Sequence, residues 1–359
     1  LTEHDWEREH LESTPAALTS LVPGLPGEID RFVQRSLEKE PAARPQSWDE
    51  IVTFFAEWYH RLTGKAVVFD FSSLALDAAE LLAASYSLSN LKRWEEMLLA
   101  CERALVIDES ISNLWLNKGF GLSCLNRKEE ALNAYDKALA IDNNNATAWM
   151  NKSSTLLDLN RDEEALLACE RALAIDQNDA RVWNNKGIAL KHLNRYEEAL
   201  QAHERAIEID QNDARMWMNK GNTLKDVKRY EEAIQAHDMA LAIDPKYLAA
   251  WCNKSNVFYD LNRYDEAIQA SDRALAIDPN FSPAWFSKGT AFLRLKRYEE
   301  AIKALDRGLA INPNHAPAWS NKGCALVALK RYDESIQVCD RALTIDPRLA
   351  AAQNMKSMA

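Results

Sequence analysis

Seven tryptophans recur every 34 residues along this chain of 359 residues. They are Trp115, Trp149, Trp183, Trp217, Trp251, Trp285 and Trp319. A fixed period of this length, kept without insertion or deletion, is typical of stacked repeats in which each unit contacts only its neighbours. The sequence therefore predicts one array of similar units over most of its length, and not the two or three globular domains that length alone would suggest.

Each period has the pattern of two amphipathic helices. Trp183, Gly187 and Leu190 have the i, i+4, i+7 spacing of one helix face. In the same way, Tyr196, Ala199, His203 and Ala206 share a face of a second helix. We interpret the small residues as points where the two helices approach closely. Neither helix can bury its apolar face alone, so neighbouring units must stack.

The spacing W-x3-G-x8-Y-x2-A-x6-A resembles the tetratricopeptide repeat (TPR), and the resemblance covers residues 81–359. It implies an all-α fold, a right-handed superhelical solenoid of α-α repeats. On this pattern residues 81–347 hold eight units of 34 residues. Gln353 stands where the next tryptophan would fall, so residues 348–359 are expected to begin a further repeat or to form a capping helix.

Residues 1–65 do not follow the period. The stretch L-E-K-E-P-A-A-R-P-Q-S-W-D-E-I, Leu37–Ile51, resembles the end of the C-lobe of bacterial-type Ser/Thr protein kinases. This implies that residues 1–65 are a C-terminal remnant of such a domain, with residues 66–80 as a connector. The Gly-rich loop, the V-A-I-K lysine, the H-R-D loop and the D-F-G motif are missing from the chain. We expect no enzyme activity from this chain, although its parent protein would then be a Ser/Thr protein kinase.

The composition narrows the classes of partner. A formal net charge of -11 argues against nucleic acid and against an anionic membrane surface. No apolar run is long enough for a transmembrane helix. The six cysteines form no C-x-x-C pair, which favours a reducing, cytoplasmic location. His203 and His237 share a repeat position without nearby metal-ligand spacing, so no metal and no other cofactor is expected.

A column of asparagines marks the candidate binding face. Asparagine follows the tryptophan by two residues in six of the seven units, at Asn117, Asn151, Asn185, Asn219, Asn253 and Asn321. Residues at -2, +2, +5 and +9 from the tryptophan form a stripe away from the packing face. The resemblance implies that this stripe lines a concave groove. It also includes Arg181, Arg215, Asn222 and Asn256.

An asparagine amide offers donors and an acceptor that match the N–H and C=O of a peptide. We therefore expect this chain to be a protein–protein interaction scaffold whose groove binds extended peptides, in the C-terminal part of a signalling kinase. The two arginines would favour acidic partners. Three alternatives stay open. The asparagines can simply follow the repeat pattern, the array can self-associate through its ends, or it can be the regulatory or substrate-recruiting tail of an active kinase.

Overall fold

The computed structural model describes residues 76–358, and within this range every element is an α-helix. The all-α prediction is confirmed for the described residues. The chain divides between Asn143 and Asn144 into two compact units, which are described separately. In the first unit the helices are α5 (Ala78–Asn90), α6 (Trp94–Ile107), α7 (Ser112–Cys124) and α8 (Lys128–Ile141).

The second unit continues the same alternation of 13- and 14-residue helices up to its last helix. Its helices are α9 (Ala146–Asp158), α10 (Asp162–Ile175), α11 (Ala180–His192), α12 (Tyr196–Ile209), α13 (Ala214–Asp226), α14 (Tyr230–Ile243), α15 (Leu248–Asp260), α16 (Tyr264–Ile277), α17 (Ser282–Arg294), α18 (Tyr298–Ile311), α19 (Ala316–Ala328), α20 (Tyr332–Ile345) and α21 (Ala350–Met358).

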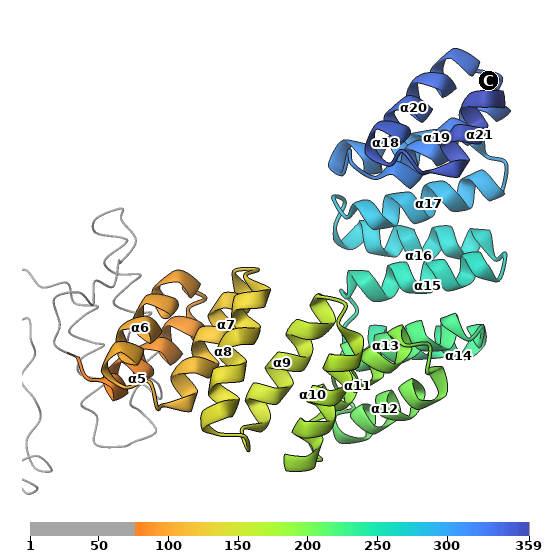
Figure 1. The fold of residues 1–359 in the computed structure, drawn as a ribbon. Coiled ribbons are helices and arrows are strands. Elements are labelled where there is room, and N and C mark those ends of the chain that lie inside the picture. The colour runs from red at the N-terminus through yellow and green to blue at the C-terminus, as the bar shows by residue number, and fades with distance from the viewer. Residues whose placement is uncertain (1–75, 359) are drawn as a thin grey trace, which may run out of the picture. The chain divides into compact units, whose positions relative to one another are not determined.

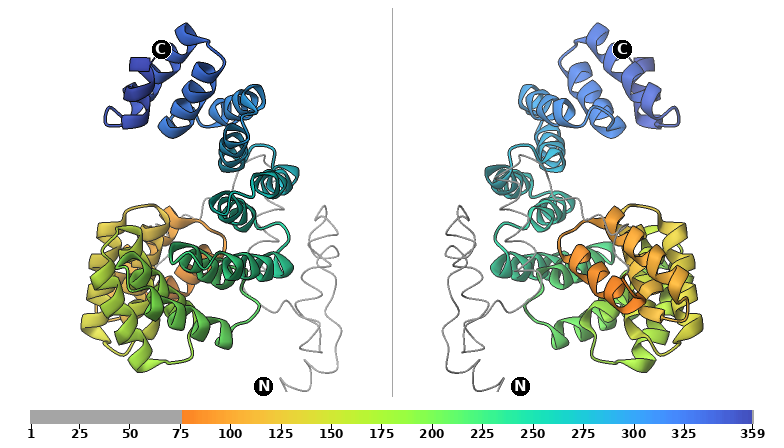
Figure 2. Two further views of the ribbon diagram at one scale, coloured as in Figure 1. Left: turned by 90° about the vertical axis from the view of Figure 1, so that its right-hand side faces the viewer. Right: turned by 90° about the vertical axis from the view of Figure 1, so that its left-hand side faces the viewer.

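The helices form antiparallel pairs. We call the tryptophan-bearing helices and their equivalents A helices (α5, α7 and so on to α21) and the others B helices (α6 to α20). Each A helix packs against the B helix that follows it, and each B helix packs against the next A helix within its unit. In the second unit A helices also contact the next A helix, as in α13, α15 and α17, so one face of the stack is built from A helices alone (Figure 1, Figure 2).

Helix α5 begins three residues before Leu81, just as α7 begins three residues before Trp115. Asp77 caps α5 by accepting a hydrogen bond from the Glu80 backbone N–H at 2.8 Å, and the Glu80 carboxylate accepts from the Asp77 N–H at 2.9 Å. This reciprocal cap fixes the start of the helix at Ala78. Leu81 is fully buried in the place of the missing tryptophan. The expected kinase remnant, including Arg44, and residues 66–75 of the connector lie outside the described residues.

The turn from each A helix to its B helix uses one residue with positive φ. These residues are Lys92, Asn126, Asn160, Asn194, Lys228, Asn262, Lys296 and Lys330. The next residue closes the turn, as where the Arg195 N–H donates to the Leu190 carbonyl at 2.8 Å. A left-handed residue of this kind ends a helix with its last carbonyls satisfied. Asparagine tolerates this conformation better than lysine does.

Close approach of the paired helices depends on matched small and large residues. A Cβ at Gly187 would lie 2.5 Å from Cε1 of His203, so the imidazole occupies the space that a side chain at 187 would need. The partner of each small residue stands 16 positions later. The same site holds Gly119 with Tyr135, Gly289 with Leu305 and Gly323 with Cys339. The predicted close approach at Gly187 is therefore confirmed, and its partner is His203.

The tryptophans pack between repeats and close the preceding loop. The Trp217 ring packs against apolar clusters that include Leu200 and Ala240. Its Nε1–H donates to the Gln211 carbonyl at 3.2 Å, and the indoles of α15 and α17 likewise donate to the carbonyl six residues earlier. In α21 the Gln353 amide donates to the Pro347 carbonyl at 2.9 Å, as the tryptophan does elsewhere. Residues 350–358 therefore repeat the A-helix pattern.

Candidate functional site

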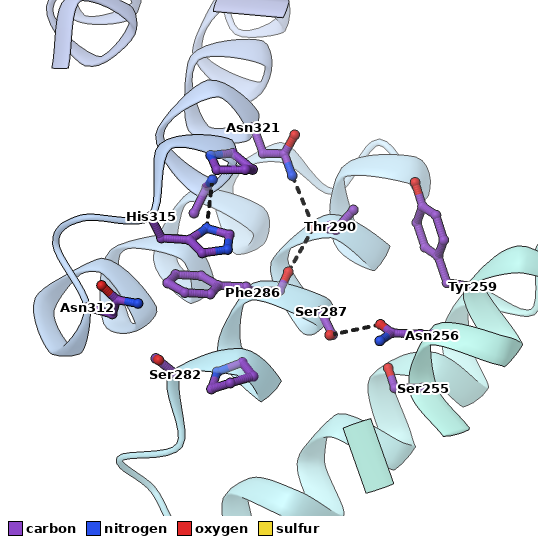
Figure 3. Close-up of a pocket in the computed structure, with 13 residues that line it drawn as sticks. Ser255, Asn256, Tyr259, Ser282, Phe286, Ser287, Thr290, Asn312, His315 and Asn321 are labelled. Carbon is purple, nitrogen blue, oxygen red and sulfur yellow. Dashed lines mark hydrogen bonds between the residues drawn. The ribbon is translucent and has the colours of Figure 1, made fainter. Parts of the chain in front are cut away.

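A pocket of about 390 Å³ opens on the A-helix face of the second unit, among α15, α17 and α19. Figure 3 shows its lining. The residues are Ser255, Asn256 and Tyr259 from α15, Ser282, Pro283, Phe286, Ser287 and Thr290 from α17, and Asn312, His315, Pro317, Ala318 and Asn321 from the next loop and α19. None of these residues carries a carboxylate, an ammonium or a guanidinium group, so the lining is polar but without a fixed charge.

The pocket is located where two repeats, those of Trp285 and Trp319, depart from the pattern of the others. Two residues before the tryptophan, Pro283 and Pro317 stand where Arg181 and Arg215 stand in earlier units. Ser287 replaces the asparagine of the column. These side chains are shorter than those they replace, so they leave space between successive A helices.

An aromatic pair forms one wall. The rings of Phe286 and His315 are stacked, with centroids 4.2 Å apart and planes 16° apart. Gly308 on the B helix makes room for this arrangement, because a Cβ there would lie 2.4 Å from Cε1 of Phe286. The other described repeats have alanine at the equivalent position. The glycine is thus required by the large side chain at 286.

His315 also fixes the start of α19. Its Nδ1 accepts a hydrogen bond from the Ala318 backbone N–H at 3.1 Å. Partial burial lowers the pKa of His315, so the neutral ring is favoured. With Nδ1 acting as an acceptor, the proton of the neutral ring is on Nε2. The wall therefore adds one N–H donor, and Figure 3 shows the ring above Phe286 at the pocket edge.

Two asparagine amides flank the centre of the pocket. The Thr290 hydroxyl donates to the Phe286 carbonyl at 2.8 Å, so its oxygen is left to accept from Asn321 Nδ2 at 3.1 Å. This orientation leaves Asn321 Oδ1 as an acceptor. On the other side the Ser287 hydroxyl donates to Asn256 Oδ1 at 3.1 Å, which leaves the Asn256 NH₂ as a donor. The pocket lining thus includes one amide donor, on Asn256, and one amide acceptor, on Asn321, that no hydrogen bond within the lining uses.

The asparagine column predicted from the sequence has an additional role. Asn117 is only 7% exposed, and its Nδ2 donates to Ser85 Oγ at 2.8 Å. Asn185 Nδ2 donates to Ser153 Oγ at 3.1 Å, one repeat earlier. Asn219 donates in the same direction, to Asn184 Oδ1 at 2.9 Å. These amides therefore use one donor to join neighbouring A helices, and only their remaining groups are available to a ligand.

The remaining asparagines of the stripe differ in exposure. Asn151, Asn222 and Asn253 are half-buried, and Asn256 is exposed. Of the residues named from the sequence, only Asn256 and Asn321 line the pocket.

The two arginines contribute less free charge than their sequence positions suggest. Arg181 Nη2 lies 2.7 Å from Asp179 Oδ2, and Arg215 Nη2 lies 2.6 Å from Asp213 Oδ2. Both aspartates cap the N-terminus of the same helix that carries the arginine. The hydrogen bond from Arg215 holds the pKa of Asp213 below its usual range. A ligand would meet a neutral pair at each place, and not an isolated cation.

Sequence reasoning missed Tyr259, Thr290 and His315 as pocket residues. The useful signal was the set of departures from the repeat at 283, 287, 308 and 317, which all surround one place. Tyr259 forms the far wall, with the Arg294 guanidinium 5.6 Å above its ring. Within residues 76–358 no group of three or more His, Cys, Asp or Glu side chains is arranged to hold a metal ion. In that same range no helix is both long and apolar enough to cross a membrane.

Family models support the repeat assignment. Four models described as tetratricopeptide repeat match the chain, at residues 126–187, 180–213, 212–280, and 252–316 with 286–350. Together they span residues 126–350, which is more than half of the chain. None of the curated proteins compared with the chain matches it.

Solved structures agree on the fold. The APC/C hetero-tetramer Cut9-Hcn1 matches with a TM-score of 0.58 and 16% identity, over 100% of this chain and 67% of that one. A tetratricopeptide repeat protein from Parabacteroides merdae matches with a TM-score of 0.58 and 16% identity, over 69% and 98%. PilF of Pseudomonas aeruginosa matches with a TM-score of 0.52 and 18% identity, over 60% and 97%. At these identities the likeness concerns the fold alone.

Proposed function

The chain belongs to the tetratricopeptide repeat family, and from this premise we propose that the A-helix face of its second unit binds an extended polypeptide. Repeats of this family serve as scaffolds for protein–protein interactions. The pocket among α15, α17 and α19 is the centre of the proposed site. The single observation that carries the proposal is that one pocket lining holds both the amide donor of Asn256 and the amide acceptor of Asn321.

The hydrogen-bonding pattern matches a polypeptide backbone. An extended peptide presents alternating N–H and C=O groups at its edges. The Asn256 NH₂ can donate to a carbonyl, and Asn321 Oδ1 can accept from an amide N–H. Both amides are held in place by Ser287 and Thr290, so little side-chain freedom is lost when a ligand binds. The site is therefore prepared for main-chain recognition, which is independent of the ligand's sequence.

The lining favours one uncharged side chain of the ligand. Placing an ionised group in a partly enclosed pocket without a counter-charge costs free energy. Phe286, Tyr259 and the two prolines offer apolar surface instead. Because Arg181 and Arg215 are paired with their own capping aspartates, we expect acidic partners to gain only a small advantage there.

Selection from a library of random unstructured peptides tests the proposal. Selected peptides would be measured by fluorescence anisotropy against the wild type and the double variant Asn256→Ala/Asn321→Ala. Losing two hydrogen bonds of about 0.5–1.5 kcal/mol each should weaken binding roughly 5- to 100-fold. Gln269→Ala, which removes an exposed amide from a B helix, is the matched control and should bind as the wild type does.

Two results would contradict the proposal. Unchanged affinity of the double Asn variant for every selected peptide would place binding elsewhere. A library that yields no binder, from a chain that sediments as a dimer, would favour self-association through the ends of the array.

A second proposal concerns the protein to which the array belongs. The resemblance of Leu37–Ile51 to a kinase C-lobe supports an array that recruits substrates or regulators for a Ser/Thr protein kinase in signalling. The six free thiols are consistent with a cytoplasmic location. Determining the gene sequence upstream of Leu1 tests this proposal. An H-R-D loop and a D-F-G motif are expected there, and an unrelated domain would overturn it.

A further inference from the structure

One position of the B helices holds a positively charged residue in all repeats but one. The residue 22 positions after the tryptophan is a cation in every repeat except one. The residues are Lys137, Arg171, Arg205, Met239, Arg273, Arg307 and Arg341, and Arg103 stands at the same place in the first repeat. Met239 on α14 is the exception, and its side chain is 45% exposed. Among the eight repeats, only the repeat of Trp217 therefore lacks a cation at this position.

Elsewhere this cation can cover the tryptophan of its own repeat. Lys137 Nζ lies 4.2 Å from the centre of the Trp115 ring, and the Arg307 guanidinium lies 5.8 Å from that of Trp285. A cation over an indole face is attracted by the negative face of the ring. In these two repeats the chain therefore places a cation from its own B helix over the tryptophan face.

At Met239 the corresponding space is open. A pocket of about 440 Å³ lies between α13 and α14, bordered by Trp217, Leu224 and Met239. Two carboxylates, Glu232 and Asp238, also line it. The pocket thus combines an indole, apolar surface for an alkyl chain, and acidic groups at its border. These are the features that a lysine or arginine side chain requires.

The local charges are consistent with a missing cation. Lys220 is the cation in the lining, and its Nζ lies 2.9 Å from Glu204 Oε1 and 5.9 Å from the Trp217 ring centre. Glu232 is paired with Arg229 at 2.6 Å, and Asp238 is paired with Lys254. Each of the three charged residues in the lining is therefore paired with a residue of opposite charge. Relative to the other repeats, this place therefore lacks one positive charge that the geometry accommodates.

We propose that the pocket over Trp217 binds a lysine or arginine side chain from a basic segment of a partner protein. The incoming alkyl chain would lie along Met239 and Leu224, and its charged end would lie over the Trp217 indole, as Lys137 and Arg307 lie over the indoles of their own repeats. The chain's net charge of -11 also favours approach of a basic partner. This site uses α13 and α14, whereas the peptide site proposed above uses α15, α17 and α19, so either can fail without the other.

Nuclear magnetic resonance of the indole N–H groups tests the proposal. The Trp217 Nε1–H is ordered by its bond to Gln211, and its signal can be assigned as the one lost in Trp217→Phe. The probes are the peptides Ac-Gly-Lys-Lys-Gly-NH₂ and Ac-Gly-Gln-Gln-Gly-NH₂. The lysine peptide should shift the Trp217 signal in a saturable way, and the glutamine peptide should not.

Two matched variants come from the repeat itself. Met239→Arg gives this position the residue found in other repeats, and its own side chain should then fill the pocket and weaken the lysine peptide at least roughly fivefold. Arg307→Met removes a cation that lies over Trp285, so the Trp285 signal should become responsive as well. Each variant copies a residue that another repeat already holds, so both are expected to fold.

Three outcomes would overturn the proposal. The first is a wild-type Trp217 signal that does not respond to the lysine peptide. The second is an equal response in Met239→Arg. The third is an equal response to both peptides or at all tryptophans, since that would indicate general electrostatic attraction and not a site.

Discussion

At the scale of single residues, two histidines are buried without hydrogen-bond partners. His203 and His237 are fully inaccessible, and none of their ring nitrogens has a partner among the described residues. Burial lowers the pKa of His203 to about 3 and that of His237 to about 4, and nearby lysines act in the same direction. Lys191 and Lys220 are the charged neighbours of His203, and Lys225 and Lys254 are those of His237.

These histidines should make the array sensitive to acid. Their folded-state pKa values lie below the unfolded value of about 6.5. Below that pH the unfolded chain binds protons that the folded chain does not, so the free energy of unfolding falls as the pH falls. At pH 5 each histidine should lower the free energy of unfolding by about 2 kcal/mol relative to pH 7. The double variant His203→Leu/His237→Leu, which copies the Gly289–Leu305 pair, should lose much of this dependence. Urea unfolding at pH 5 and pH 7 measures this difference in the free energy of unfolding. An equal loss between the two pH values in the wild type and the variant would contradict the account.

Gly308 should be needed for the pocket. In Gly308→Ala the new methyl would meet the Phe286 ring at 2.4 Å, so the ring must move away from its stacked position on His315. Overpacking of this kind typically costs about 1–3 kcal/mol. We expect both thermal stability and affinity for a selected peptide to fall. Adding Phe286→Leu should restore stability but not affinity. Full affinity in Gly308→Ala alone would show that the aromatic wall is not part of the site.

At the scale of helices and turns, the eight left-handed residues offer a stability test. Lysine in this conformation has a steric cost that glycine does not have. Lys296→Gly should therefore stabilise the second unit by roughly 0.5–1 kcal/mol in chemical denaturation. Asn262→Gly, at the equivalent turn, should gain less because asparagine tolerates positive φ better. A loss of stability in Lys296→Gly would mean that the lysine side chain makes a contribution that outweighs backbone strain.

Helices were more predictable than the site, for a physical reason. The period of 34 residues and the spacing of Trp183, Gly187 and Leu190 depend on packing that every repeat shares, so each repeat confirms the others. The pairing of Gly187 with His203 was hidden because it joins residues on two helices. Helix starts also depend on local caps, such as the reciprocal cap of Asp77 and Glu80 at Ala78, which the tryptophan period does not describe.

The site was only partly predictable because it depends on exceptions to the repeat. The asparagine column drew attention to the A-helix face, and Asn256 and Asn321 do line the pocket there. The hydrogen bonds from Asn185 and Asn219 to the preceding repeat could not be derived from spacing alone. The stacking of His315 on Phe286 depends on a loop conformation that no periodic pattern describes.

At the scale of the whole molecule, the two compact units contain one repeated plan that is modified locally. Contacts between neighbours hold such an array together, so single repeats can change their surface without altering the fold. In the second unit two places depart most from the plan. One is the pocket of α15, α17 and α19, and the other is the open face of Trp217. If both proposed sites bind as expected, this separation would let one regular scaffold hold two different partners.

Photo-crosslinking of a selected peptide tests the central claim most directly. The peptide would have a benzophenone side chain in place of its most buried residue, and the unmodified chain would be mapped by mass spectrometry after irradiation. If the A-helix face is the binding site, the peptide should attach within residues 255–259, 282–290 or 312–321, the three segments that contain the pocket lining. Attachment confined to the exposed surface of the B helices, such as the side of α18 that includes Lys303, would contradict the account.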